Sequence, residues 1–402
     1  DGVREILADV QANGDAALQR LTVKFDGVAP AALEISRDEM KAAWDALPAL
    51  DQAVIERARR NIKTFHKAQM PAPIEVETEP GVLCRREARA IETAGLYVPG
   101  GTAPLISTLL MLAVPAKVAG VQNRIVVTPP GKDGRVNSAI LAAAYRCKVS
   151  ALYAVGGAQA IGALAYGTET IPRCDKIFGP GNAWVAAAKS LVAQAAGGPA
   201  IDMPAGPSEA MVLADAAADP VFVASDLLSQ AEHDTVAQVV CVATSTAVAD
   251  DIAAEIERQV ATLPREAIAR QSLTLGRMII ADGRADIVDI VNRYAPEHLI
   301  VQLQNPDEYV PAIQNAGSIF LGPWTPESVG DYASGTNHTL PTYGAARAYS
   351  GVTLDSFLKY ISVQKLTRKG LESLGPVVER LAEMEGLEAH KRAVSLRLEA
   401  LQ

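Results

Sequence analysis

The chain has 402 residues, a formal net charge of −9 and 49% apolar residues. The apolar content excludes a disordered protein, and a negative net charge without a basic block argues against nucleic-acid binding. The length is sufficient for two or three domains, each with its own core.

The cysteines are few and widely separated. Cys84, Cys147, Cys174 and Cys241 form no CxxC pair, which excludes a disulfide scaffold and the usual zinc-knuckle and thioredoxin spacings. We expect reduced, mostly buried thiols in a cytoplasmic protein. The first residues include neither an initiator Met nor a signal-peptide pattern, so we expect no export and a missing natural start.

Two long uncharged windows, 93–116 and 149–168, are interrupted by Gly and Pro. A membrane-spanning helix needs about 20 predominantly apolar residues in a row. We therefore interpret both windows as buried strand–turn–helix units and expect no membrane association.

The first part of the chain is predicted to be helical. Val3, Ile6, Leu7 and Val10 fall at helical spacing, and residues 54–65 continue a second amphipathic run. From about residue 120, short apolar strands alternate with helices. The pattern predicts strand 124–128, helix 138–145, strand 151–155, a helix from 158, strand 176–178 and a helix from 182. This βαβαβα order favours a parallel sheet with helices on both faces.

A second α/β unit follows, without a clear residue-level repeat. The expected elements are strand 210–213, helix 221–229, strand 237–242, helix 248–260, strand 277–280, helix 287–291 and strands 299–301 and 318–321. From about Ser356 the chain is predicted to be helical again. This amphipathic tail must dock on the body or on a second subunit, because it cannot bury its apolar stripe alone.

Three glycine-containing segments, 96–101, 155–160 and 178–182, follow or end predicted strands. Ligands of doubly wound sheets bind beyond the carboxyl ends of the strands, and helix N-termini present N–H groups to phosphates. None of the segments matches GxGxxG with a downstream acid. Each alone is a tight turn or a ligand loop, and together they indicate a nucleotide site.

Several histidines lie beside other polar residues. His66 lies in a charged helix and is interpreted as a surface or packing residue. Gln230 and His233 are three residues apart and share a helix face. Glu297 and His298 are adjacent, either an acid–base pair or a solvated helix end.

Two further histidines lie in distinctive segments. The polar loop 330–338 contains Asp331 and His338 and is interpreted as functional, and His390 lies in the tail. A divalent metal could be held by His, carboxylate and amide oxygen atoms here, although no HExxH spacing is present. The rigid segment 202–209 joins the two α/β units, and domain junctions are common ligand sites.

Eight ordered motifs carry a resemblance to a known family. They are GLYVPGG (95–101), GGAQAIGALAYGTE (156–169), DKIFGPGN (175–182), DMPAGPSE (202–209), DLLSQAEHD (226–234), APEHL (295–299), GDYASGTNHTLPTYG (330–344) and EGLEAHKRAVSLR (385–397). Together they resemble the L-histidinol dehydrogenase family, zinc- and NAD-dependent enzymes of histidine biosynthesis. The resemblance covers essentially the whole chain.

The resemblance implies an α/β fold with two incomplete Rossmann-like, doubly wound parallel-sheet domains and a helical C-terminal tail. Residues 1–96 and 209–352 would form a first, discontinuous α/β domain, and residues 97–208 an NAD-binding Rossmann-like domain. Residues 353–402 would be the tail that contributes to the dimer partner's active site. Family members normally carry a further N-terminal segment that helps to form the dimer.

The implied reaction is the four-electron oxidation of L-histidinol through L-histidinal to L-histidine, with two NAD⁺ reduced in turn. His298 would be the general base, and Glu297 would activate the water that adds to the aldehyde. An imidazole with an ordinary pKa can take and return protons at neutral pH.

The resemblance also implies binding residues. One Zn²⁺ per subunit would be held by Gln230, His233, Asp331 and His390 and would position the substrate. The implied NAD contacts are Tyr97, Gln159 and Asn182. The implied substrate contacts are Ser208, Gln230, His233, His298, Asp331, Glu385 and His390.

The implied assembly is a cytoplasmic homodimer with shared active sites and no nucleic-acid or membrane partner. One alternative is a family relative that oxidises another small alcohol, such as a sulfonated diol. Glu385, His390 and the Asp331 loop distinguish the two, since they would read the imidazole and amine of histidinol. Another is a two-lobed binding protein without catalysis, which would need neither the Glu297–His298 pair nor a metal set.

Overall fold

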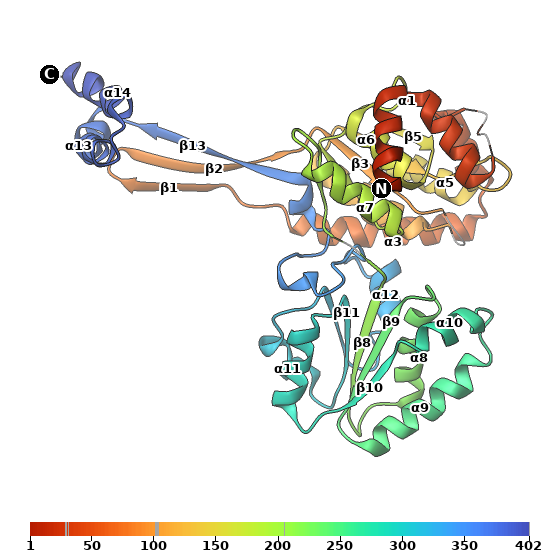
Figure 1. Ribbon diagram of the computed structural model, residues 1–402. Coiled ribbons are helices and arrows are strands. Elements are labelled where there is room, and N and C mark those ends of the chain that lie inside the picture. Colours follow the sequence, from red (N-terminus) through yellow and green to blue (C-terminus); the bar gives the residue numbers. More distant parts are fainter. Residues whose placement is uncertain (29, 31, 101–103, 205, 402) are drawn as a thin grey trace. The chain divides into compact units, whose positions relative to one another are not determined.

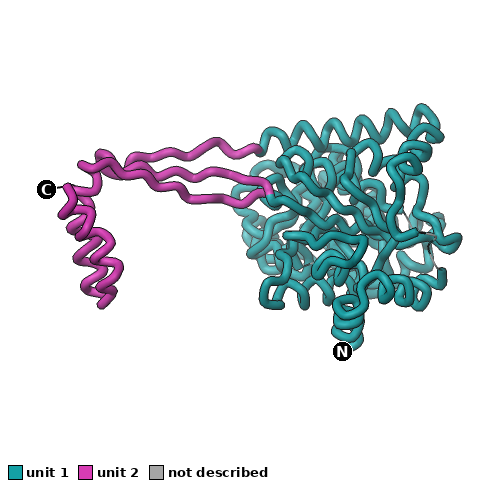
Figure 2. The backbone as a smooth tube through the Cα atoms, turned by 90° about the horizontal axis from the view of Figure 1, so that it is seen from above, with its two compact units in different colours: residues 1–69, 91–357 teal, residues 70–90, 358–402 magenta. Residues whose placement is uncertain are grey.

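The computed structural model describes residues 1–402 except 29, 31, 101–103, 205 and 402. The described residues form two compact units, one of residues 1–69 and 91–357 and one of residues 70–90 and 358–402 (Figure 2). Gly101 and Ala205, which belong to the motifs at 95–101 and 202–209, lie outside the described residues. Within the described part of the chain, no helix is long and apolar enough to cross a membrane.

The first unit contains two five-stranded parallel sheets (Figure 1). The first sheet has the order β5–β4–β3–β6–β7, with β3 Thr93–Tyr97, β4 Asn123–Thr128, β5 Ala151–Ala154, β6 Lys176–Phe178 and β7 Ala200–Ile201. Its helices are α4 Ile106–Ala119, α5 Ser138–Cys147, α6 Gly157–Tyr166 and α7 Ala183–Gln194. Ile125, Val127 and Ile177 alternate toward the face that packs on α6 and α7.

Three N-terminal helices cover this first sheet's helices. They are α1 Gly2–Asp26, α2 Arg37–Ala46 and α3 Ala49–Ala68, which pack on α6, α5 and α4 respectively. Gly162 of α6 lets α1 approach closely, since a Cβ there would lie 3.2 Å from Leu7 and 3.3 Å from Val10. The apolar stripe of α1 and the central position of β3 associate residues 1–69 and 91–97 with the first sheet, whereas residues 70–90 belong to the second unit.

The second sheet has the order β10–β9–β8–β11–β12. Its strands are β8 Glu209–Ala214, β9 Gln238–Ala243, β10 Arg277–Ile280, β11 His298–Gln302 and β12 Ser318–Leu321. Ala210 and Val212 face the core under α8 Pro220–Ala231, α9 Thr246–Val260 and α10 Glu266–Leu273. Met211 and Leu213 face α11 Arg284–Tyr294 on the opposite side (Figure 1).

Both sheets follow one pattern. The first strand is central, the second and third strands lie on one side of it, and the fourth and fifth lie on the other side. This is the doubly wound order of a Rossmann-like sheet with one strand fewer. The predicted fold class is therefore confirmed. The unit is completed by α12 Glu327–Tyr332 and four short 3₁₀ turns, Pro306–Glu308, Val310–Ala312, Ala345–Arg347 and Leu354–Phe357.

The second unit is an antiparallel ribbon with two helices at one end (Figures 1 and 2). Its strands, in the order β1–β2–β13, are Ile74–Glu79, Val82–Ala90 and Leu358–Leu366, and its helices are α13 Arg368–Met384 and α14 Glu388–Glu399. The tail expected to be helical from about residue 356 therefore begins with a strand. Its pairing partner β2 is far away in the sequence, at Val82–Ala90, so local periodicity does not reveal the pairing.

Candidate active site

A buried polar cluster lies where the amino ends of β8 and β11 meet. Glu209 begins β8 and His298 begins the neighbouring parallel strand β11. Helix α11 ends at Tyr294, and the left-handed φ of 57° at its C-cap, Ala295, turns the chain toward Glu297. Glu297 and His298 are 5% and 4% exposed. The cluster thus lies at the amino edge of the sheet. Ligands of such sheets usually bind at the opposite edge, beyond the carboxyl ends of the strands.

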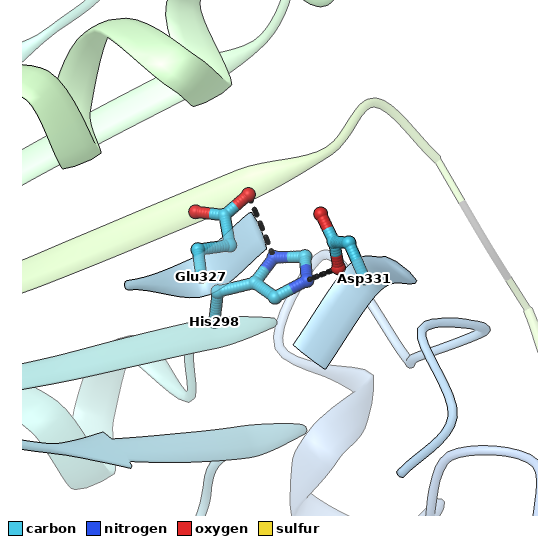
Figure 3. Close-up of side chains that lie close together, drawn as sticks. All are labelled: His298, Glu327 and Asp331. Atoms are coloured by element: carbon cyan, nitrogen blue, oxygen red, sulfur yellow. Dashed lines mark ion pairs between the residues drawn. The ribbon is translucent and has the colours of Figure 1, made fainter. Parts of the chain in front are cut away.

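The ring of His298 is held between three partners. Its Nδ1 lies 3.0 Å from the carbonyl oxygen of Glu209, and a carbonyl only accepts, so Nδ1 carries the proton. Its Nε2 lies 3.4 Å from Oδ1 of Asp331, and Nδ1 lies 3.9 Å from Oε1 of Glu327. Figure 3 shows the imidazole between these two carboxylates, which are four residues apart on α12.

Glu297 is anchored by the same backbone that holds His298. Its Oε2 accepts from the N–H of Glu209 at 2.8 Å and lies 3.7 Å from Nδ1 of His298. The main chain of Glu209 therefore orients both residues of the predicted acid–base pair, one through its N–H and one through its carbonyl.

Burial and charge shift the acidities in this cluster. Burial raises the pKa of Glu297 to about 7 and that of Glu327 to about 8. Burial lowers the pKa of His298, but Glu327, Glu297 and Asp331 together raise it well above its ordinary value. Burial also raises the pKa of Asp331, but His298 outweighs it and holds this pKa below the usual range. The three carboxylates around His298 therefore stabilise the imidazolium that forms when the ring takes a second proton.

The cluster has the donor set of a divalent metal site. His298, Glu327 and Asp331 offer ligand atoms that all lie within 4.8 Å of one another. Among the described residues, His298 Nε2, Glu327 Oε2 and Gln230 Nε2 are buried without a hydrogen-bond partner. A half-turn of the Gln230 amide exchanges its nitrogen and oxygen, so Gln230 can offer an oxygen instead. A bound cation would satisfy the amide and carboxylate atoms, so the residues present fit one and leave Nε2 of His298 free.

The predicted metal and substrate residues lie in both units. Gln230 is buried in the last turn of α8, and Ser208 is half-buried just before β8. His233 follows α8 and is solvent-exposed. Glu385 and His390 are exposed residues of the second unit. Glu385 is the C-cap of α13, and His390 lies in the first turn of α14.

The predicted cofactor residues lie at the carboxyl edge of the first sheet. The hydroxyl of Tyr97, the last residue of β3, accepts from the N–H of Gly157 at 3.2 Å. Gln159 is buried in α6. Asn182 is the exposed N-cap of α7. Strands β3 and β6 are adjacent at the point where the strand order reverses. In this fold the nucleotide usually binds at that point.

A buried ion pair holds the loop before Asn182. Gly179 has a φ of 118°, and a Cβ there would lie 2.1 Å from the oxygen of Tyr97, so only glycine fits. Its N–H donates to Oδ2 of Asp202 at 2.8 Å, and its carbonyl accepts from Nζ of Lys189 at 2.9 Å. Lys189 and Asp202 are themselves paired.

Some residues of the cluster were not singled out from the sequence. Glu327 is one, and its spacing of four residues from Asp331 is the signal that could have indicated it. Glu209 lies in a quoted motif but had no assigned role. His338 anchors the Asp331 loop, since its Nδ1 contacts the Asp331 carbonyl at 3.0 Å and its Nε2 lies 3.1 Å from Oγ1 of Thr108 on α4.

Comparisons with known proteins agree with the sequence motifs. Residues 1–398 match the family model described as histidinol dehydrogenase. The chain is 52% identical over 400 residues to the histidinol dehydrogenase of Vibrio cholerae serotype O1, covering 100% of this chain and 92% of that protein. It is 51% identical over 399 residues to that of Aliivibrio fischeri, covering 99% of this chain and 90% of the relative. The crystal structure of histidinol dehydrogenase from Elizabethkingia anophelis superposes with a TM-score of 0.96 at 48% identity, covering 99% and 92% of the two chains. The chain therefore belongs to the histidinol dehydrogenase family.

Proposed function

We propose that this chain oxidises L-histidinol through L-histidinal to L-histidine and reduces two NAD⁺ in succession. The observation that carries the proposal is the buried His298, whose Nδ1 proton is committed to Glu209, in a chain of this family. The relatives named above are all histidinol dehydrogenases, and no observation favours the alternative of a sulfonated diol.

In this proposal His298 is the general base. Because Nδ1 donates to a carbonyl, Nε2 is the atom that takes the alcohol proton as hydride leaves the substrate carbon. The carboxylates of Asp331 and Glu327 then stabilise the imidazolium. The same atom serves in both oxidation steps, provided that the proton leaves between them.

Glu297 activates water for the second oxidation. An aldehyde must be hydrated before it can lose another hydride, and hydration requires a base that removes a proton from water. The pKa of Glu297, raised by burial to about 7, makes this carboxylate an effective base near neutral pH. Its bond to the N–H of Glu209 fixes one oxygen, Oε2.

We assign the metal as Zn²⁺ and its protein ligands as Gln230, His233, Asp331 and, from the tail, His390. When bound, Zn²⁺ holds the substrate's imidazole and amine so that the alcohol faces the base. The orphaned amide of Gln230 and the position of Asp331 beside His298 support this assignment. Ser208 and Glu385 would contribute further substrate contacts.

We assign NAD⁺ to the carboxyl edge of the first sheet, in contact with Tyr97, Gln159 and Asn182. Helices α6 and α7 begin at this edge, and their N-terminal N–H groups suit a pyrophosphate. The position of Tyr97 and Asn182 at the ends of adjacent strands supports this assignment.

We further propose a cytoplasmic homodimer in which the tail supplies Glu385 and His390 to the partner's site. In the second unit the helices expose large apolar side chains, such as Val377 at 53%, Leu381 at 55% and Met384 at 70%. A second copy of the chain would bury such a surface. The free cysteines agree with a reducing compartment.

NADH formation with L-histidinol, measured with and without a chelator, tests the main proposal. We expect two NADH per histidinol, loss of activity on chelation and recovery with Zn²⁺. A yield near one NADH, or indifference to chelation, would contradict the proposal.

A further inference from the structure

Tyr343 occupies a turn whose conformation disfavours it. The N–H of Ala345 donates to the carbonyl of Thr342 at 3.0 Å, and the central residues Tyr343 and Gly344 have φ values of 54° and 69°. Two positive φ values are the pattern of a type I′ turn, which favours Asn or Gly at the first central position. A bulky aromatic residue with positive φ is an outlier that points to a function.

The turn is tied to the acid–base pair. The N–H of Tyr343 donates to Oε1 of Glu209 at 3.0 Å, and the main chain of Glu209 holds Glu297 and His298. Thr342 is 3% exposed, and its hydroxyl accepts from the N–H of Gly206 at 2.6 Å. The backbone at Tyr343 is therefore fixed relative to the catalytic cluster.

Core packing does not explain why residue 343 carries an aromatic side chain. Tyr343 is 73% exposed, so little burial offsets the unfavourable backbone. The ring rests on Gly206, where an added Cβ would lie 2.1 Å from Cε2 and 2.3 Å from Cδ2. Gly206 lies two residues before Ser208 and three before Glu209. The chain thus presents a largely open aromatic ring, carried on a fixed backbone, beside the site.

We propose that Tyr343 is a ligand-binding residue whose ring packs against a planar nitrogen heterocycle during the reaction. The proposed function supplies three such groups, the imidazole of L-histidinol and the nicotinamide and adenine of NAD⁺, and the inference rests on that function. Flat aromatic groups attract one another in offset or edge-to-face contact, and a residue whose backbone is already fixed loses less entropy on binding. Asn, which suits the turn better, offers no such surface.

Tyr343→Asn separates this role from a structural one. The variant relieves the turn, so its melting temperature should equal or exceed that of the wild type. Its kcat/KM should nevertheless fall about tenfold, the size of one lost aromatic contact. Tyr343→Phe keeps the ring and should stay within about twofold of the wild type. Tyr349→Asn, at another exposed tyrosine of the same segment, is the matched control and should leave kcat/KM unchanged.

Gly206→Ala tests the position of the ring without removing it. The added methyl should displace the ring, reproduce the defect of Tyr343→Asn, and cause no further loss in the double variant. The KM values distinguish the ligand, because a rise confined to L-histidinol indicates imidazole and a rise confined to NAD⁺ indicates one of the two rings of the cofactor.

Three results would overturn the inference: wild-type kinetics in Tyr343→Asn, equal losses in the Asn and Phe variants, or a lowered melting temperature that accounts for the loss. A failure of the proposed function would be recognised independently of this inference. In that case the wild-type chain itself would form no NADH from L-histidinol.

Discussion

Lys189 and Asp202 form an ion pair with side chains only 5% and 1% exposed, and both residues also bond to the main chain of Gly179. Asp202 begins the segment that ends at Glu209. That segment therefore contacts the proposed cofactor loop at one end and the Glu297–His298 pair at the other. A displacement of the loop would change the distance between cofactor and base.

Replacing Lys189 by Met should affect cofactor binding more than substrate binding. The change leaves Asp202 buried without its cation, which typically costs about 3–5 kcal/mol of stability. At a temperature where the variant remains folded, KM for NAD⁺ should rise several-fold more than KM for L-histidinol. Lys176→Met is the comparison variant, because Nζ of Lys176 bonds to the Ser356 carbonyl and acts on Asp202 only through its charge. Equal shifts in both KM values would count against a positioning role for the pair.

His298→Asn should retain the fold and bound zinc but lose turnover. Loss of a general base typically lowers the rate by about 10²–10⁴-fold. Steady-state NADH formation gives the rate, while metal analysis and the melting temperature verify the folded, loaded protein. A variant with wild-type turnover would show that another group is the base.

A mixture of His390→Ala and His298→Asn subunits should regain part of the activity if sites are shared across a dimer. In a mixed dimer both defects then fall in the same site, so the other site of the dimer is intact. NADH formation after subunit exchange, demonstrated with differently tagged chains, measures the recovery. Proven exchange without recovery would argue that each site is built from a single chain.

The stability of the first unit should depend on pH through His66. The ring is fully buried, Nδ1 lies 2.8 Å from the Ile62 carbonyl, and burial lowers its pKa below the ordinary value. The unfolded chain therefore takes up a proton at a higher pH than the folded chain. The stabilisation is complete above pH about 6.5 and is lost as pH falls toward the folded pKa, by up to about 1.4 kcal/mol per pH unit.

His66→Gln keeps an N–H donor but does not titrate, so it isolates this effect. Urea unfolding of both proteins from pH 8 to pH 5 should show the wild type losing stability relative to the variant. A constant difference across this range would mean that His66 titrates alike in both states.

Local patterns in the sequence were sufficient to predict most strands of the first unit. The predicted strands at 176–178, 277–280 and 318–321 coincide with β6, β10 and β12. Buried parallel strands are short apolar runs between turn residues, and that signal is local. The strand of residues 358–366 was not predicted, because its identity depends on pairing with β2.

The candidate site shows the same division. Glu297 and His298 are adjacent in sequence, so their pairing was visible there, whereas Glu327 meets His298 only because α12 packs over the amino end of β11. For His66, the sequence left open a surface or a packing role, and burial in the folded unit decided it.

The sequence by itself determined the order of the elements, the α/β class and, through its ordered motifs, the family, because each depends on neighbouring residues. Only the tertiary structure decided that the cluster forms at the amino edge of the second sheet and that the backbone of Glu209 orients both residues of the pair. The physical reason is that main-chain hydrogen bonds follow from strand order and register. These arise when distant segments pack and carry no signature in the side chains of any one segment.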